Sequence, residues 1–290
     1  MLSLPIQFSK LLKRFLLLTI FTLFTTLAHA EKVYKLKLAE TWGPNFPIFG
    51  DASKNMATMA EKMSNGRLKI IIHSSNKHKS PFGIFDMVKS GQYDLGHSAS
   101  YYWKGKTSAS QFFTAVPFGM NAQEMNGWLH YGGGLALWQE LYSDFNLVPL
   151  AGGSTGVQMA GWFNKEINTV EDLKGLKMRI PGLAGEVLQR VGGIPVTLPG
   201  GELFTALQTG SIDATEWVGP YNDLTFGLHK AAKYYYYPGW HEPGAMLEFL
   251  VNKDAWNSLP KDLQAIVTHA TRAMNQDMLD EYTARNNAAL

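Results

Sequence analysis

Segments with the residue pattern of strands alternate along most of the chain with segments that have the spacing of helices. Residues 33–39 alternate apolar and polar side chains as a half-buried strand does, whereas Met56, Met59 and Met63 recur at helical spacing within residues 49–63. Further strands are expected at residues 67–73, 93–97, 147–151, 157–164, 177–180, 195–198 and 214–217, and helices at 82–90, 122–142, 182–191 and 202–209, with a helical turn at 170–173. This alternation with short turns predicts an α/β protein with mixed, mostly parallel sheets.

A short turn of the form Gly-x-x-Asp occurs twice. Residues 91–94 and residues 210–213 each follow an expected helix and lead into a short strand. The repetition predicts two similar α/β lobes, with the stretch around residues 148–164 crossing between them. Because ligands of open parallel sheets bind beyond the carboxyl ends of the strands, we expect a cleft between the lobes, lined by residues 98–103 and 216–222.

The composition excludes several classes of protein. The 290 residues are 46% hydrophobic, which is too apolar for a mostly disordered chain and enough for a core of ordinary density. The sequence has no Cys, which excludes disulfides, thiolate metal sites and cysteine nucleophiles. A formal net charge of +2, scattered along the chain, does not supply the basic face that a nucleic-acid-binding protein needs.

Residues 1–30 have the features of a secretory signal peptide. Lys10, Lys13 and Arg14 precede a short apolar run, and Ala28-His29-Ala30 forms a small-x-small cleavage site. The apolar run is well short of the ~20 residues that span a bilayer, so we expect export with cleavage after Ala30 rather than anchoring. The remaining chain has a formal net charge of −1 and is expected to be a soluble periplasmic protein.

No motif of a familiar catalytic or metal centre occurs in the sequence. The eight His residues form no HExxH or other tight metal spacing, which argues against zinc. Glu216 and Glu242 are candidates for a pair of catalytic carboxylates, but only their distance can show this. A periplasmic hydrolase that uses these two residues is therefore one alternative, and it predicts turnover and an open groove.

Arg179 is the most informative residue, because it stands at a strand end just before Pro181 and Gly182. A guanidinium in that position can make two charge-assisted hydrogen bonds to a carboxylate, although a surface ion pair is an equal alternative. Gln158 lies on an expected apolar strand, where a buried amide needs partners. Glu216 and nearby backbone carbonyl groups offer the oxygen ligands that Na+-like or Ca2+-like cations prefer.

Six segments together carry a resemblance to a known family. They are residues 45–47 (Asn-Phe-Pro), 91–94 (Gly-Gln-Tyr-Asp), 115–120 (Ala-Val-Pro-Phe-Gly-Met), 178–182 (Met-Arg-Ile-Pro-Gly), 216–220 (Glu-Trp-Val-Gly-Pro) and 237–244 (Tyr-Pro-Gly-Trp-His-Glu-Pro-Gly). From about residue 32 onward the chain resembles the substrate-binding receptors of tripartite ATP-independent periplasmic (TRAP) transporters, most of all the branch that binds 2-oxo or 2-hydroxy monocarboxylates such as pyruvate and lactate. The resemblance implies a two-lobed periplasmic binding protein fold with crossover strands and a long helix that spans both lobes. It also implies ligand capture by lobe closure and delivery to membrane permease subunits.

The resemblance implies roles in substrate binding for several residues. Arg179 corresponds to the arginine that pairs with the substrate carboxylate, and Gln158 to a polar residue that contacts both substrate and cation. Tyr101 or Tyr102 corresponds to an aromatic residue that closes over the ligand, with Asn45 nearby. An arginine already held by a permanent protein partner would argue against this assignment.

The resemblance also implies one bound cation and no organic cofactor. Glu216 corresponds to the metal-binding carboxylate, and Gln158, the carbonyl group of Trp217 and Glu242 correspond to further positions around the metal. The cation would be Na+ or Ca2+ and would bridge protein and ligand, and Trp217 would thereby border the substrate as well.

The expected organisation of the chain follows from these assignments. Residues 31–153 with part of 243–262 form the first lobe, 154–242 the second, and 243–290 a return strand and C-terminal helices. Members of the family usually continue for some tens of residues, so the final segment is expected to be truncated, and some members of this branch form homodimers by exchanging a terminal helix. A receptor for a larger acid, such as sialate or a dicarboxylate, is a further alternative that would need more basic residues in the cleft.

Overall fold

The computed structural model describes residues 31–290, and residues 34–290 form one compact unit by themselves. The predicted signal peptide, residues 1–30, lies outside the described residues. No helix within residues 31–290 is both long enough and apolar enough to cross a membrane.

A five-stranded mixed sheet contains the first strands of the chain and one strand that returns late. Its order is β2 (Leu68–His73), β1 (Tyr34–Glu40), β3 (Leu95–Ser98), β10 (Met246–Asn252) and β4 (Leu147–Ser154). β1 is parallel to β2 and β3, whereas β10 is antiparallel to β3 and β4. Every residue of β10 is buried, because the strand lies between two others and elements pack on both faces of the sheet.

A second five-stranded sheet is built from shorter strands. Its order is β7 (Ile194–Val196), β6 (Lys177–Arg179), β8 (Ala214–Thr215), β5 (Gly161–Phe163) and β9 (Tyr234–Tyr236). β6 is parallel to β7 and β8, and β5 is antiparallel to β8 and β9. β4 and β5 are consecutive in the chain but lie in different sheets, so residues 155–160 lead from one sheet to the other. Two mixed sheets with intervening helices confirm the predicted α/β class.

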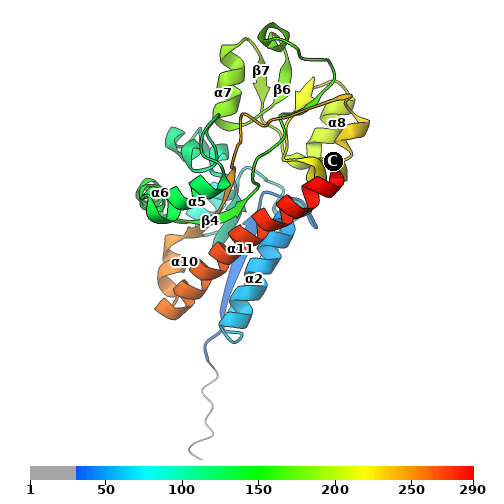
Figure 1. Ribbon diagram of the computed structural model, residues 1–290. Coiled ribbons are helices and arrows are strands. Elements are labelled where there is room, and N and C mark those ends of the chain that lie inside the picture. The colour runs from blue at the N-terminus through cyan, green and yellow to red at the C-terminus, as the bar shows by residue number, and fades with distance from the viewer. Residues whose placement is uncertain (1–30) are drawn as a thin grey trace, which may run out of the picture. The chain divides into compact units, whose positions relative to one another are not determined.

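Helices connect the strands and pack on the sheets (Figure 1). Between strands of the first sheet the helices are α2 (Phe49–Met63), α3 (Ser75–His78), α4 (Ile84–Lys89), η1 (Ser100–Trp103), η2 (Ser108–Phe113), α5 (Ala122–Tyr131) and α6 (Gly134–Ser143). The second sheet is connected by η3 (Val170–Leu173), α7 (Gly182–Arg190), η4 (Gly200–Glu202), α8 (Leu203–Gln208), α9 (Pro220–Thr225) and η5 (Leu228–Lys230). The chain then passes through α10 (Lys253–Ser258) into α11 (Lys261–Ala289), a helix of 29 residues that packs along α2 and β4.

The end of α11 is bonded to α9, which follows the second sheet's β8. The hydroxyl of Tyr282 donates a hydrogen bond to Asn222 Oδ1 at 2.6 Å, and Asn286 Oδ1 accepts one from the backbone N–H of Tyr221 at 3.0 Å. The side-chain amide of Asn222 donates in turn to the carbonyl oxygen of Pro47 at 3.3 Å. α11 is therefore in contact with elements of both sheets.

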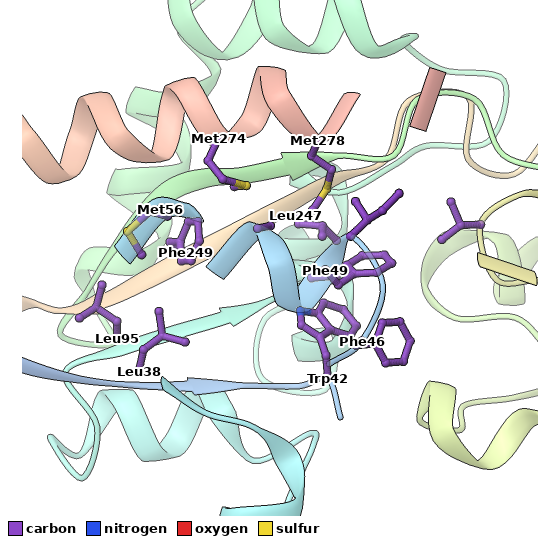
Figure 2. Packing of buried hydrophobic residues seen from close by; sticks show 14 of the residues in the cluster. Leu38, Trp42, Phe46, Phe49, Met56, Leu95, Leu247, Phe249, Met274 and Met278 are labelled. Carbon is purple, nitrogen blue, oxygen red and sulfur yellow. The ribbon is translucent and has the colours of Figure 1, made fainter. Parts of the chain in front are cut away.

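The largest apolar cluster lies between the first sheet and the helices α2 and α11. Met274 and Met278 of α11 face the strands of this sheet, and Phe249 of β10 lies beneath them (Figure 2). Burial of each such side chain contributes about 1.5–3 kcal/mol relative to exposure. Near the second sheet the cluster continues through Trp42 to Trp217, whose ring centroids are 6.3 Å apart. The core thus reaches the place where the two sheets approach each other.

The two Gly-x-x-Asp turns make the same contacts in the two sheets. Asp94 Oδ2 accepts a hydrogen bond from the backbone N–H of Lys37 in β1 at 2.7 Å, and Asp213 Oδ2 accepts one from that of Lys177 in β6 at 2.8 Å. Each aspartate also donates its own backbone N–H to the carbonyl group of the same lysine, at 3.0 and 2.7 Å. The repetition found in the sequence therefore corresponds to a matched pair of turns, one at each sheet.

The single helix predicted for residues 122–142 is wrong. The structure has two helices, α5 and α6, which are separated at Gly132 and Gly133. Gly133 has a φ of 87°, and a Cβ at Gly134 would lie 2.6 Å from the ring of Trp128. The chain turns back over this indole at a distance that only glycine allows. Apolar residues at helical spacing flank the break on both sides, which is why the pattern resembled one helix.

The strand predicted for residues 157–164 is restricted to β5, and Gln158 lies outside it. The backbone N–H of Gln158 donates to the carbonyl of Glu242 at 3.2 Å, whereas that of the next residue, Met159, donates to Val218 at 2.9 Å. A Cβ at Gly161 would lie 2.4 Å from the carbonyl oxygen of Thr215. Successive residues bond to different segments, so no ladder forms, but the backbone of Gln158 is still fixed.

Glu248 in β10 is a fully buried carboxyl group. It accepts hydrogen bonds from the Trp103 indole and, at 2.7 Å, from the Tyr142 hydroxyl, and no cation pairs with it among residues 31–290. Burial raises the pKa of Glu248 to about 7 from a usual value of 4.5. The pKa of Glu248 is higher in the folded chain than in the unfolded one. Its contribution to the free energy of unfolding is therefore fully present below about pH 4.5 and is lost as the pH rises towards and through 7.

We therefore expect Glu248→Gln to raise the melting temperature at pH 8. The gain corresponds to at most about 3 kcal/mol, since the variant no longer has to ionise in the core, and it should shrink towards pH 5. Thermal unfolding of both proteins at pH 5 and pH 8 measures the effect. Glu140→Gln, which changes an exposed carboxylate of α6, is the matched control. A lower melting temperature for Glu248→Gln than for the wild type at pH 8 would contradict this account.

Candidate functional site

The predicted site residues gather where strands of both sheets end. Arg179 is the last residue of β6, and it lies opposite Thr215 of β8, so that Glu216 and Trp217 follow directly beside it. Tyr102 belongs to η1, which follows β3 of the first sheet. Arg179 Nη2 donates a hydrogen bond to the Tyr102 hydroxyl at 3.1 Å. The carboxyl ends of strands from the two sheets therefore meet at this point, as is usual for ligand sites in α/β proteins.

Arg179 is held on every side, with 1% of its surface exposed. Its Nη1 donates to the Glu216 carboxylate and, at 3.3 Å, to the carbonyl oxygen of Glu216, while Nε donates to the carbonyl of Leu198 at 3.2 Å. The guanidinium carbon lies 5.0 Å from the ring centroid of Trp217, which gives a cation–π contact. Arg179 thus has a buried protein carboxylate, Glu216, as its partner, which is the arrangement named above as an argument against its role as the anchor of a ligand. Of its two terminal nitrogens, only Nη2, which donates to the Tyr102 hydroxyl, has no carboxylate partner among the described residues.

Gln158 and Glu242 form a second buried pair next to this arginine. The Gln158 side-chain amide donates to Glu242 Oε2 at 2.8 Å and to Thr155 Oγ1 at 3.1 Å. The other end of this amide, Gln158 Oε1, is buried and accepts no hydrogen bond within the described residues. A buried acceptor without a donor costs free energy, so this oxygen is suited to a cation or to a ligand hydroxyl group.

His241 is a further buried side chain of the cluster and lies next to the carboxylate of Glu216. His241 Nε2 lies 3.4 Å from Glu216 Oε2, and both side chains are 1% exposed. Glu216, His241 and Glu242 offer ligand atoms that all lie within 4.8 Å of one another, a spacing that one metal ion can bridge. Carboxylate and amide oxygens are the usual ligands of Ca2+ and similar cations.

The buried charges of the cluster alter each other's ionisation. Burial, and then the charge of Glu216, raises the pKa of Glu242 well above its usual value, while Arg179 opposes this shift. Burial by itself would lower the pKa of the Arg179 guanidinium, but Glu216 and then Tyr102 outweigh it and raise that pKa. Arg179 therefore stays positively charged, whereas the raised pKa of Glu242 favours the protonated form of this carboxyl group when no cation lies beside it.

A small enclosed cavity adjoins these groups. Its volume is about 10 Å³, roughly the space of one water molecule. It is lined by residues of both sheets and their connections, namely Trp42, Phe49, Tyr101, Tyr102, Thr155, Gln158, Trp217, Val218, Glu242, Ala245 and Leu247. Hollows of about 530 to 590 Å³ lie elsewhere in the unit, but no predicted site residue lines them. The chemistry of the donors, not the size of the hollow, identifies the site.

The structure brings together all but one of the residues predicted for the site. Tyr101 and Tyr102 both line the cavity, with their rings edge to face at a centroid distance of 4.6 Å. Asn45 is the exception: its side chain is exposed and accepts a hydrogen bond from Lys54 Nζ at 3.3 Å. The next residue, Phe46, turns inward instead and packs on Trp217 at a centroid distance of 5.6 Å.

His241 is the residue of the cluster that sequence analysis did not predict. The search for tight histidine spacing failed because Glu216 and His241 come from separate segments, the turn after β8 and the loop after β9. A weaker signal was present, since His241 directly precedes Glu242 within a loop bounded by Pro and Gly. The aromatic wall formed by Trp42 and Phe49 was also missed. Trp42 lies in the turn after β1 and Phe49 is the first residue of α2, and aromatic residues at such positions resemble ordinary core.

Comparisons with known proteins place this site in context. Residues 38–290 match the model of the family described as bacterial extracellular solute-binding protein, family 7 (DctP). The chain is 49% identical over 254 residues, 88% of this chain and 70% of the relative, to the monocarboxylate 2-oxoacid-binding periplasmic protein of Nostoc sp..

Two solved structures agree closely with the fold. A TRAP periplasmic solute binding protein from Colwellia psychrerythraea, with bound calcium and pyruvate, is 61% identical with a TM-score of 0.87, and the match covers 89% of this chain and 78% of that one. Another from Pseudoalteromonas atlantica, with bound sodium and pyruvate, is 60% identical with the same TM-score and coverage. The predicted two-lobed periplasmic binding protein fold is confirmed, and the alternative of a hydrolase is wrong. The chain belongs to the DctP family of bacterial extracellular solute-binding proteins, the substrate-binding receptors of TRAP transporters.

Proposed function

We propose that this protein captures a small 2-oxo or 2-hydroxy monocarboxylate, such as pyruvate or lactate, together with one cation. The observation that carries the proposal is a fully buried guanidinium, Arg179, beside two buried carboxylates and an amide oxygen that accepts no hydrogen bond from residues 31–290. The names of the Nostoc relative and of the two similar structures, with their 2-oxoacid, pyruvate, calcium and sodium, support the same chemistry.

The cation would be held by oxygen atoms of Gln158, Glu216 and Glu242, with the backbone carbonyl of Trp217 as a further ligand. The unpartnered Gln158 Oε1 fits this role, since an amide oxygen is a good ligand for Na+ or Ca2+ and needs no proton. The charge of the site fits as well. With Glu242 ionised, a monocarboxylate added to one guanidinium and two carboxylates gives an excess of two negative charges. A cation between these groups offsets that excess and favours the ionised form of Glu242, in a place where unpaired charge costs several kcal/mol.

The carboxylate of the ligand would bind on the Nη2 side of Arg179. Nη1 donates to the Glu216 carboxylate, whereas Nη2 donates only to the Tyr102 hydroxyl. Of the two terminal nitrogens, Nη2 is therefore the one that can bond to a ligand carboxylate. A ligand carboxylate placed between Nη2 and the tyrosine gains charge-assisted hydrogen bonds. The keto or hydroxyl oxygen of the same ligand can then reach the cation, and Tyr101 closes the wall beside it.

The size of the cavity supports capture by closure. A volume of about 10 Å³ admits no three-carbon acid unless the walls separate, and these walls come from the connections of two different sheets. Relative movement of the two lobes is the kind of hinge motion that opens such a site. The charges also oppose a larger, doubly charged acid. Apart from Arg179, no Lys or Arg among the described residues pairs with Glu216 or lines the cavity, so a second ligand carboxylate would face Glu216 and Glu242.

The same proposal includes the cellular location of the protein and its membrane partner. Residues 1–30 direct export and are removed after Ala30, and the mature receptor works in the periplasm. There it delivers its ligand to the membrane permease subunits of a TRAP transporter. The homodimer formed by a terminal helix stays a prediction.

Calorimetric titration of the purified mature protein in a buffer with Ca2+ tests the proposal. We expect pyruvate or lactate to bind with one-to-one stoichiometry and a Kd of about 1 µM or lower, which corresponds to about −8 kcal/mol. Succinate should bind at least about 100-fold more weakly, because no Lys or Arg lines the cavity to pair with its second carboxylate. Tighter binding of succinate, or no binding of either monocarboxylate, would refute the proposed ligand class.

A further inference from the structure

A hollow of about 530 Å³ lies apart from the site beside Arg179. It is lined by parts of the turn between α5 and α6, of the strand β4 and of the helix α11, which are neighbours in the fold (Figure 1). Within residues 31–290, the hollow shares no lining residue with the small cavity at Arg179. Pockets that bind small molecules have volumes of about 300–1,000 Å³. The hollow is therefore large enough for a ligand of its own.

One part of the lining is apolar. Leu129 comes from α5, Leu135 and Ala136 from α6, and Leu150 and Ala151 from β4. Leu129, Leu150 and Ala151 are buried, whereas Ala136 is exposed. Removal of a ligand's apolar surface from water against these side chains is favourable. This part of the hollow suits an alkyl chain or an aromatic ring.

The permanent charge of the lining comes from Arg272 of α11. Among residues 31–290, it is the only Lys or Arg that lines the hollow, and no Asp or Glu lines it. Its guanidinium carbon lies 5.9 Å from the ring centroid of Tyr131, a side chain that is 85% exposed. The guanidinium has neither an ion pair nor a hydrogen bond within the described part of the chain. It is therefore available to an anion.

A second arginine of the same helix shows what Arg272 lacks. Arg285 lies over the ring of Tyr221 at 5.1 Å, as Arg272 lies over a tyrosine of its own, but Arg285 Nε also donates to the carboxylate of Glu281. The position four residues before Arg272 holds Thr268 instead, and this residue lines the hollow as well. An anionic ligand can thus take at Arg272 the place that Glu281 has at Arg285.

Two imidazoles line the hollow beside Arg272, those of His130 and His269. Burial, and then the charge of Arg272, lower the pKa of His130, so that this ring is neutral at pH 7. The ring of His269 is exposed to water. Arg272 is thus the one permanent positive charge that the described residues contribute to the lining, which fits a ligand with a single negative group.

We propose that this hollow is a second binding site, for a small amphiphilic monoanion that has one carboxylate or sulfonate group on an alkyl chain or aromatic ring. The anionic group bonds to the Arg272 guanidinium beside Tyr131, and the apolar part lies on Leu129, Leu135 and Leu150. Pyruvate and lactate are poor ligands here, because they offer almost no apolar surface. This site does not depend on the proposed function, because among the described residues it has none in common with the cavity at the other site.

Calorimetric titration of the mature protein with octanoate tests the second site. We expect one-to-one binding with a Kd below about 1 mM. Propionate has the same carboxylate but a short chain, and it should bind at least about tenfold more weakly. Octylamine has a long chain with a positive group, and it should also bind at least about tenfold more weakly. Octane-1-sulfonate should bind within about fivefold of octanoate, because Arg272 can pair with either anionic group.

Three variants locate the binding. Arg272→Gln removes the charge and should weaken octanoate binding at least about tenfold. Arg285→Gln is the matched control, because it changes a tyrosine-stacked arginine on another part of α11, and it should leave the octanoate Kd unchanged. Ala136→Trp puts an indole into the hollow from an exposed position and should weaken octanoate at least about tenfold although the charge remains. Thermal unfolding shows that each variant is folded.

Pyruvate with Ca2+ separates the hollow from the site beside Arg179, because their presence should leave the octanoate Kd unchanged. Four results would each overturn the proposal. They are no octanoate binding in the stated range, octylamine binding as tight as that of octanoate, an unchanged octanoate Kd in folded Arg272→Gln, and displacement of octanoate by pyruvate with Ca2+. Failure of the proposed function has a different signature, since pyruvate and lactate then do not bind while octanoate still binds and still depends on Arg272.

Discussion

Arg179→Gln is expected to abolish detectable binding of pyruvate at micromolar concentrations, with a Kd raised at least about 100-fold, or about 2.7 kcal/mol. Among the described residues, Arg179 is the only Lys or Arg that pairs with Glu216, it also donates to Tyr102, and it would pair with the ligand carboxylate. Glutamine retains a hydrogen-bond donor but not the charge, so the ligand would enter a site with two buried carboxylates and no guanidinium. Calorimetric titration of the variant with pyruvate measures the loss.

The same substitution also removes the partner of Glu216, and its effect on folding must be separated from its effect on binding. Loss of one partner of a buried ion pair costs about 3–5 kcal/mol, so Arg179→Gln should also melt at a lower temperature. A double variant, Arg179→Gln with Glu216→Gln, removes both charges and should regain most of the lost stability. It should still bind no pyruvate. Micromolar binding by a well-folded Arg179 variant would show that the arginine is not the anchor of the ligand.

Removal of the cation is expected to have an effect of similar size. In a buffer freed of divalent ions by a chelator, with choline in place of Na+, the pyruvate Kd should rise at least about 100-fold. The reason is the excess of two negative charges that the ligand and the two carboxylates produce around Arg179. Addition of Ca2+ at constant ionic strength should restore the affinity, which separates a bound ion from general screening.

Glu242→Gln provides the internal control for this interpretation. The variant has one negative charge fewer next to Glu216 and Arg179, and Gln can still bond to the Gln158 amide. Its pyruvate affinity should therefore depend less steeply on the cation than that of the wild type. An unchanged pyruvate Kd of the wild-type protein without Na+ or divalent ions would disprove the role of the cation.

The order of elements and the class of the fold were predictable because hydrophobic periodicity dominates them. The two Gly-x-x-Asp turns also predicted that the two sheets are alike. In the structure, Asp94 bonds to Lys37 in the same way as Asp213 bonds to Lys177. Residues 132–134 (Gly-Gly-Gly) interrupt the helical periodicity, which indicated a bend or close helix packing within one helix, but spacing alone did not predict that the helix breaks there into two. Its cause is tertiary: the glycines accommodate the Trp128 ring.

The candidate site was predicted in part. The parts that were missed depend on tertiary contacts between segments that are far apart in the sequence. Arg179 and Glu216 each stand at a strand end in the sequence, but their pairing depends on the register of β6 and β8. His241 joins them only because the loop after β9 folds back over that edge. Asn45 was placed near the ligand by resemblance alone, and the turn that exposes it directs Phe46 inward instead.

α11 has a consequence for how abruptly the receptor can open. Met274 and Met278 fix its middle in the core of the first sheet, whereas Tyr282 and Asn286 near its end bond to α9, which follows β8 of the second sheet. A continuous helix bends little, so we expect these bonds to break together with the one between Arg179 and Tyr102 when the lobes separate. We therefore expect half-released intermediates to be sparse and the exchange of the ligand to be cooperative.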